Sequence, residues 1–98
     1  MKRLKNIHPG EVLLEDFLKP LGISQYRLAI ACGLPHSRIT DIIKGRRGIS
    51  ADTALRLARA LGTSADLWLG LQRDFDLEEA SLANAKSYQA IPLLAQAA

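Results

Sequence analysis

Apolar residues recur at helical spacing along nearly the whole chain. No stretch of alternating apolar and polar residues, bounded by turn residues, occurs before the C-terminal tail. The pattern therefore predicts an all-α protein.

The first expected helix begins at Pro9, because proline suits the first turn, where a missing N–H costs nothing. Glu11, Glu15 and Asp16 lie early in it, where negative charge favours the helix dipole. Pro20 and Gly22 are expected to end it. The residues expected to face the core are Leu14, Phe17, Leu18 and Leu21.

Two short helices follow. Ser24 is an N-cap for a helix over residues 25–32, and Gly33 ends it. Pro35 opens a third helix that runs to Lys44, with Ile39, Ile42 and Ile43 on its core face. Gly45 ends this helix, and residues 46–48 form a basic turn.

Two longer helices complete the pattern. Ser50 caps the fourth, Gly62 closes it, and Ser64 caps the fifth. Residues 78–86 either extend the fifth helix or form a short sixth one. Ile91–Leu94 is expected to be extended, since Pro92 disfavours helix, and the Ala/Gln end is expected to fray. The apolar residues of the fourth and fifth helices are Ala54, Leu57, Ala58 and Leu61, then Leu67, Trp68, Leu71 and Phe75.

The composition fits one globular domain. The chain has 98 residues, of which 48% are apolar and 23% charged. A single cysteine excludes a disulfide framework and favours a reducing, cytoplasmic location. The longest stretch without Asp, Glu, Lys or Arg covers the last twelve residues, too short to cross a bilayer, so no membrane partner is expected. The basic start lacks the apolar run of a secretory signal.

Charge is distributed unevenly along the chain. Residues 1–64 hold eleven Lys and Arg against five Asp and Glu, whereas residues 65–98 hold two against five. The basic part indicates a polyanion partner, most often nucleic acid. The acidic part indicates either contact with a basic partner or simple solubility.

Residues 25–44 meet the demands of a helix-turn-helix. Two helices that cross sharply need a small residue at the contact, and Ala29 fits that position. Gly33 supplies the left-handed turn, and Leu34 follows it into the core. Ile39 and Ile42 hold the second helix while its other face stays free for the DNA major groove. The segment resembles the helix-turn-helix of the Cro/repressor (XRE) class.

The surrounding residues sharpen this resemblance. The segments 7–18, 20–22, 24–29, 45–58, 68–72 and 76–77 are similar to HigA-type antitoxins, although Asn is commoner in that family where this chain has Gly70. The similarity covers about residues 7–79. It implies a five-helix Cro/repressor-like DNA-binding domain over residues 1–79, with a short C-terminal extension over residues 80–98.

The resemblance also implies a function. A HigA-type protein is a homodimer that binds double-stranded operator DNA, represses its own operon and neutralises a HigB-type ribonuclease toxin that cuts messenger RNA on the ribosome. Such a protein would be cytoplasmic and associated with the nucleoid when bound to DNA. Two alternatives stay open: a solitary XRE-type regulator without a toxin, and a protein whose main activity is toxin capture, which the acidic residues 66, 74, 76, 78 and 79 favour.

The candidate DNA contacts lie on and around the third helix. His36, Ser37 and Thr40 are expected near base edges, and Arg38 would prefer guanine. Asp41 would accept from a cytosine amino group, or else orient Arg38 or Lys44. The expected contacts to the DNA backbone are Gln25, Lys44, Arg46 and Arg47, with Lys2, Arg3 and Lys5 as further candidates for a phosphate or the minor groove. The dimer surface is expected to use Trp68, Leu69, Phe75 and Ile91–Leu94.

Other conspicuous residues favour structural roles. His8 is expected to cap the first helix, Cys32 to lie in the core, and Arg56 and Arg59 to face solvent. Trp68 is expected in the core, with a dimer or toxin contact as the alternative. Neither histidine has a catalytic partner at useful spacing, and no Gly-rich phosphate loop occurs, so we expect no enzymatic activity, cofactor or metal.

Overall fold

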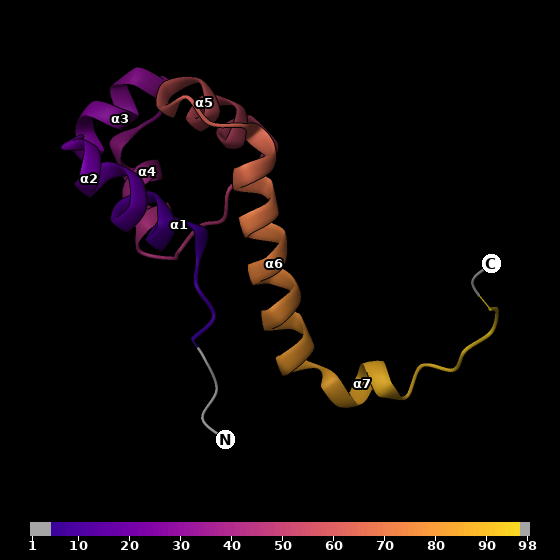
Figure 1. The fold of residues 1–98 in the computed structure, drawn as a ribbon. Coiled ribbons are helices and arrows are strands. Elements are labelled where there is room, and N and C mark those ends of the chain that lie inside the picture. The colour runs from indigo at the N-terminus through magenta and orange to yellow at the C-terminus, as the bar shows by residue number, and fades with distance from the viewer. Residues whose placement is uncertain (1–4, 97–98) are drawn as a thin grey trace.

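The computed structural model describes residues 5–96 as a helical protein (Figure 1). The first helix consists of three consecutive segments, α1 (Pro9–Val12), η1 (Leu13–Leu18) and α2 (Lys19–Leu21). The helices α3 (Gln25–Cys32), α4 (His36–Ile43) and α5 (Ala51–Leu61) follow, then α6 (Ala65–Ala83) and α7 (Ala85–Gln89). The described residues form no strand, and the predicted all-α class is confirmed.

The helix ends lie where the sequence places them. The hydroxyls of Ser24, Ser50 and Ser64 each accept a hydrogen bond from the backbone N–H three residues later, at 3.0, 3.3 and 3.1 Å. Gly22, Gly33 and Gly62 each follow the last residue of a helix, in the left-handed conformation. Local chemistry therefore fixes these boundaries independently of the core.

The first helix differs from the prediction at Pro20. Pro20 lies within the last turn, and the helix continues to Leu21. The preceding η1 segment is a π-helix, in which the Lys19 N–H bonds to the Leu14 carbonyl, five residues back. This wider spacing offsets the clash that a proline ring makes with the preceding turn of a regular α-helix. Leu21 is exposed, contrary to the prediction, whereas Leu13, the first residue of the π-helix, is fully buried.

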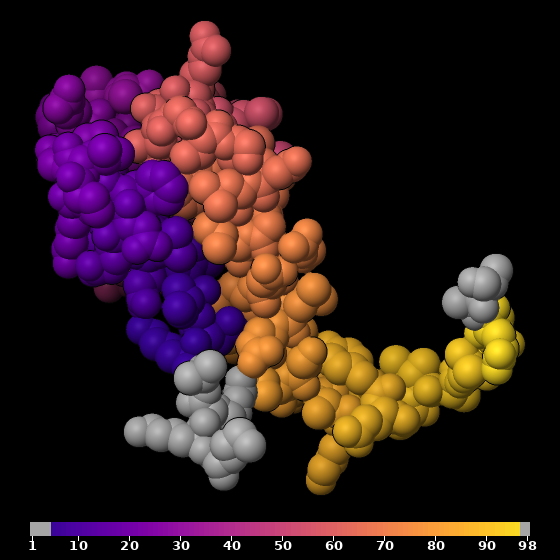
Figure 2. All heavy atoms as spheres, in the orientation of Figure 1, coloured from indigo at the N-terminus to yellow at the C-terminus, as the bar shows by residue number. Residues whose placement is uncertain are grey.

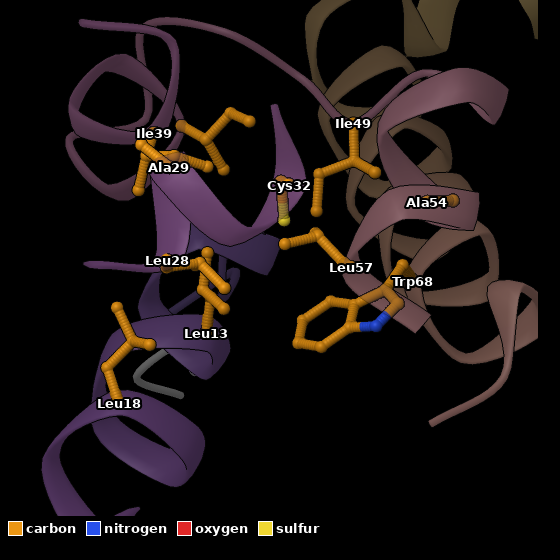
Figure 3. Packing of buried hydrophobic residues seen from close by; sticks show 11 residues of the cluster. Leu13, Leu18, Leu28, Ala29, Cys32, Ile39, Ile49, Ala54, Leu57 and Trp68 are labelled. Carbon is orange, nitrogen blue, oxygen red and sulfur yellow. The ribbon is translucent and has the colours of Figure 1, made fainter. Parts of the chain in front are cut away.

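One core unites the helices (Figure 3). Leu13, Leu28, Ile39 and Leu57, each from a different helix, are buried there. Trp68 is fully buried, and its indole N–H donates to Thr63 Oγ1 at 2.8 Å, which satisfies its single donor. The expected core role of Trp68 is confirmed, so its side chain is not available to a partner.

The C-terminal part of the chain leaves the core. Figure 1 shows α1–α5 gathered at one end, with α6 running away from them and α7 turning off at its far end. Residues 78–83 extend α6 and residues 85–89 form the short α7, so both options for this segment are realised. Residues 81–96 are all exposed, and Ile91–Leu94 has no regular secondary structure (Figure 2). The division of the chain after residue 79 stays a prediction, and that position lies within the unbroken α6.

Within residues 5–96, no helix combines the length and apolar character needed to cross a membrane.

Candidate nucleic-acid interface

A tight turn sets the angle between α3 and α4. Gly33 has a φ of 68°, and the Leu34 N–H bonds back to the Ala29 carbonyl at 2.9 Å. Ala29 is buried at the crossing, where its small side chain lets the helices approach. Pro35 takes the N-cap position, so α4 begins one residue later than predicted. The predicted helix-turn-helix geometry is confirmed.

The first helix packs closely against the C-terminal end of α4. A Cβ built on Gly10 would overlap the carbonyl oxygen of Ile42, the last core residue of α4. Only a glycine permits this approach of one backbone to another. The C-terminal end of α4 is therefore fixed against α1 as well as against the core.

The two faces of α4 have different environments. Ile39 and Ile42 are fully buried. His36, Ser37 and Lys44 are exposed, and Arg38, Thr40 and Asp41 are partly exposed. All six predicted contact residues in and directly after α4 therefore have side chains that solvent reaches, on a helix whose backbone is fixed.

Gln25 and Thr40 join the two helices. Thr40 Oγ1 donates to Gln25 Oε1 at 3.2 Å. Gln25 is the first residue of α3, so this bond brings the N-terminus of α3 next to α4. A helix N-terminus offers unpaired N–H groups and a positive dipole end, both suited to phosphate.

Asp41 differs from the expectation. It forms an ion pair with Arg46 at 3.9 Å rather than orienting Arg38 or Lys44. The reason is the path of the chain: after α4 it turns back, and the Arg46 N–H bonds to the Asp41 carbonyl at 2.8 Å. The pair is exposed, with 68% of the Arg46 side chain accessible, so it holds Arg46 only weakly.

Tyr26 is a surface residue that the sequence interpretation missed. It is exposed, and its ring meets that of His36 edge to face, with centroids 5.9 Å apart. Its position in the sequence contains a usable signal, because Tyr26 is an aromatic residue outside the apolar stripe of Leu28 and Ala29. Arg27, the next residue, is also exposed.

The basic turn after α4 carries Arg46 and Arg47, both exposed. Beyond them, the Ile49 N–H donates to Gln72 Oε1 on α6 at 2.7 Å. The turn is thus tied to the long helix by a contact between residues far apart in sequence. Lys5 forms an ion pair with Glu11 at 2.7 Å, whereas Lys2 and Arg3 lie outside the described residues.

Arg56 is exposed, as predicted, but its side chain also has two hydrogen-bond partners. Its Nη1 donates to the Cys32 carbonyl at 2.7 Å, and its Nε to Asp52 at 2.9 Å. A cation at the C-terminal end of a helix satisfies a free carbonyl and favours the dipole. Arg56 therefore stabilises the end of α3, while Arg59 is exposed as expected.

His8 and Cys32 have the predicted structural roles. His8 Nδ1 accepts a hydrogen bond from the Gly10 N–H at 2.9 Å and caps α1. Burial lowers the pKa of His8 below its usual 6.5, and Asp76 acts weakly in the opposite direction. Cys32 is buried in the core, and burial raises the pKa of its thiol. Within residues 5–96, no cluster of three or more His, Cys, Asp or Glu side chains has the arrangement of a metal site.

This arrangement of helices around a helix-turn-helix defines a DNA-binding fold of the Cro/repressor class. A helix-turn-helix family model matches residues 14–68. The chain is 51% identical over 74 residues to virulence-associated protein I of Dichelobacter nodosus, covering 76% of this chain and 68% of that protein.

Two solved structures are also similar. The Pseudomonas aeruginosa antitoxin HigA, solved with the higBA promoter, has a TM-score of 0.87 and 41% identity, covering 93% of this chain and all of that one. Antitoxin GraA in complex with its operator has a TM-score of 0.87 and 37% identity, covering 98% of each chain. The chain belongs to the helix-turn-helix family and, within it, to the HigA-type antitoxins.

Proposed function

We propose that this protein is a sequence-specific repressor that binds operator DNA of its own operon and acts as an antitoxin. The single observation that carries the DNA-binding part is α4, which is buried along Ile39 and Ile42 and open along the opposite face. Such a helix presents a fixed row of polar side chains to the major groove. Relatives solved with a promoter or an operator support the same interpretation.

The candidate contacts divide into two groups. His36, Ser37, Arg38 and Thr40 read base edges from α4, and each good bidentate contact discriminates by about 1–3 kcal/mol. Gln25, Lys44, Arg46 and Arg47 bind the phosphate backbone and set the register. Asp41 forms an ion pair with Arg46 in the free protein. In the complex, a cytosine amino group would take the place of Arg46 and donate to the Asp41 carboxylate.

The active form is a homodimer. One α4 gives few base contacts, and a two-fold dimer doubles them on half-sites about 34–36 Å apart. The exposed apolar residues between positions 77 and 94 support a dimer surface there: Leu77, Leu82, Tyr88, Ile91, Leu93 and Leu94. Trp68, a candidate from the sequence, is buried and belongs to the core instead.

A HigB-type ribonuclease toxin is the proposed protein partner. The acidic residues of α6 complement a basic toxin, and the structure leaves all five of them exposed, Asp66, Asp74, Asp76, Glu78 and Glu79. Asp74 already pairs with Arg73 at 3.0 Å, and Asp76 accepts from Gln72 at 2.9 Å. A toxin would therefore compete with contacts inside α6. Solitary regulation without a toxin is the alternative.

Two measurements test the proposal. Binding of the protein to the DNA upstream of its gene, followed against salt, should give a log–log slope steeper than about −3 if a dimer neutralises several phosphates. A shallower slope contradicts phosphate-driven binding by a dimer. Co-purification with the product of the adjacent small gene tests the antitoxin part, and failure to form a complex leaves a solitary regulator.

A further inference from the structure

The basic turn is fixed at both ends although it is not part of a helix. At its start, the Gly45 N–H bonds to the Ile42 carbonyl at 3.1 Å, directly after α4. At its end, Ile49 is buried, and its N–H donates to Gln72 Oε1 at 2.7 Å. The two exposed cations, Arg46 and Arg47, lie between these anchors.

The Gln72 amide has only one orientation that satisfies both neighbours. Its oxygen must face the Ile49 N–H, and its NH₂ group donates to Asp76 Oδ1 at 2.9 Å. Flipping the amide would set a donor against a donor and an oxygen against a carboxylate. Asp76 therefore fixes the amide that holds the turn.

Gly48 shows how closely the turn packs on this amide. A Cβ built on Gly48 would lie 3.0 Å from Gln72 Nε2 and 3.1 Å from both Cδ and Oε1. These distances are shorter than ordinary van der Waals contact, so the glycine lets the turn pack directly on the amide.

We propose that Gln72 is a positioning residue for DNA binding. It fixes the turn through Ile49 so that Arg46 and Arg47 meet the phosphate backbone, and this role rests on the proposed function. Because Gln72 lies on α6, the helix that extends to the proposed dimer surface, it connects that helix physically to the DNA contacts.

The first test removes the acceptor. Gln72→Leu keeps the side-chain size but leaves the Ile49 N–H without its partner, and we expect operator affinity to fall about tenfold. In a protein that already carries Arg46→Ala and Arg47→Ala, the same change should cost less than about twofold, because Gln72 acts through those cations. Equal losses in both backgrounds would overturn the proposal.

The second test restores the network with its polarity inverted. In the double variant Gln72→Glu/Asp76→Asn, a carboxylate accepts from Ile49 and the new amide donates to that carboxylate, with no change in net charge. We expect affinity within about twofold of the unchanged protein. If the double variant bound the operator as weakly as Gln72→Leu does, the hydrogen bonds of Gln72 would not be what maintains operator affinity.

Controls separate this inference from the proposed function. If the unchanged protein does not bind its upstream DNA, the proposed function fails. The same variants are then measured on a random-sequence duplex at low salt, because Arg46 and Arg47 contribute to binding of any DNA sequence. Amide hydrogen exchange at Ile49 should accelerate in Gln72→Leu, and melting curves establish that each variant is folded at the assay temperature. If Gln72→Leu does not fold, Asp76→Ala, which frees the amide and also removes the charge that acts on His8, takes its place, and unchanged affinity for it overturns the proposal.

Discussion

Gly10 and Ile42 lie so close that a single methyl group on Gly10 would overlap the Ile42 carbonyl. This contact joins the first turn of α1 to the last turn of α4. We expect Gly10→Ala to destabilise the protein by about 3 kcal/mol, because neither backbone has room to move. Urea unfolding followed by circular dichroism measures the change.

Gly70 gives a matched control for that substitution. A Cβ there meets only the end of the Arg73 side chain, at 3.8 Å. Gly70→Ala should therefore stabilise α6 by about 0.5–1 kcal/mol through helix propensity. If Gly10→Ala and Gly70→Ala lowered the free energy of unfolding by similar amounts, close packing at Gly10 would not be the cause of its loss of stability.

Alanine substitutions in the basic turn and in α4 should affect DNA binding differently. Arg46→Ala should weaken binding to operator and random DNA alike and reduce the salt slope by about two, because each protomer of the proposed dimer loses one phosphate contact. His36→Ala and Arg38→Ala should lose mainly the preference for operator. Competition binding measures both quantities, with Arg59→Ala as the control, because it removes an exposed charge outside the candidate interface. If the Arg46, His36 and Arg38 variants lost operator preference to the same extent, the exposed face of α4 would not be the surface that reads the bases.

Tyr26 adds an aromatic surface beside His36. Tyr26→Ala removes the edge-to-face contact, an interaction worth about 0.5–1.5 kcal/mol, and frees the His36 ring. Operator affinity should fall about threefold to tenfold, while Tyr26→Phe, which keeps the ring, should stay within about twofold. Unchanged affinity in Tyr26→Ala would place this ring outside the interface.

His8 makes stability depend on pH. Its pKa is lowered in the folded protein, so the unfolded chain binds the proton more readily. Stability is therefore complete above the unfolded pKa, near 6.5, and falls as the pH drops below it. Melting temperatures at about pH 7.5 and 5.5 measure this loss. His8→Asn keeps a capping acceptor without a titrating ring and should lose less, whereas an equal loss would assign the effect to another group.

The C-terminal segment should govern assembly without governing folding. Residues 84–96 are all exposed, and deletion from residue 84 onward should leave the melting temperature nearly unchanged. The shortened protein should be monomeric at concentrations where the full chain is a dimer, as measured by analytical ultracentrifugation. A shortened protein that still dimerises would show that residues 84–96 are not needed, and would leave Leu77 and Leu82 as the residues of the proposed interface to test next.

Local signals made much of the fold predictable. Serine caps, terminal glycines and the Ala29–Gly33 spacing each act over a few residues, and they place α3, α5 and the turn before α4. Two features do not follow from such signals. Leu21 is exposed after a π-helical turn that the apolar spacing does not encode, and Arg56 reaches the Cys32 carbonyl from another helix.

In the candidate interface, too, some features follow from local sequence signals and others do not. The exposed residues of α4 follow from the helical period, because Ile39 and Ile42 mark the opposite face. The contact between Gln72 and Ile49 joins residues 23 positions apart, a pairing that no local pattern encodes.

The unbroken course of α6 has a consequence for operator geometry. Each residue of an α-helix turns the chain by about 100°. In the proposed dimer, one extra residue in the outer half of α6 would rotate the two α4 helices relative to one another without altering either one. We expect such an insertion mutant to bind its original operator less tightly, and selection from a pool of sites with randomised spacers would reveal the new spacing between half-sites.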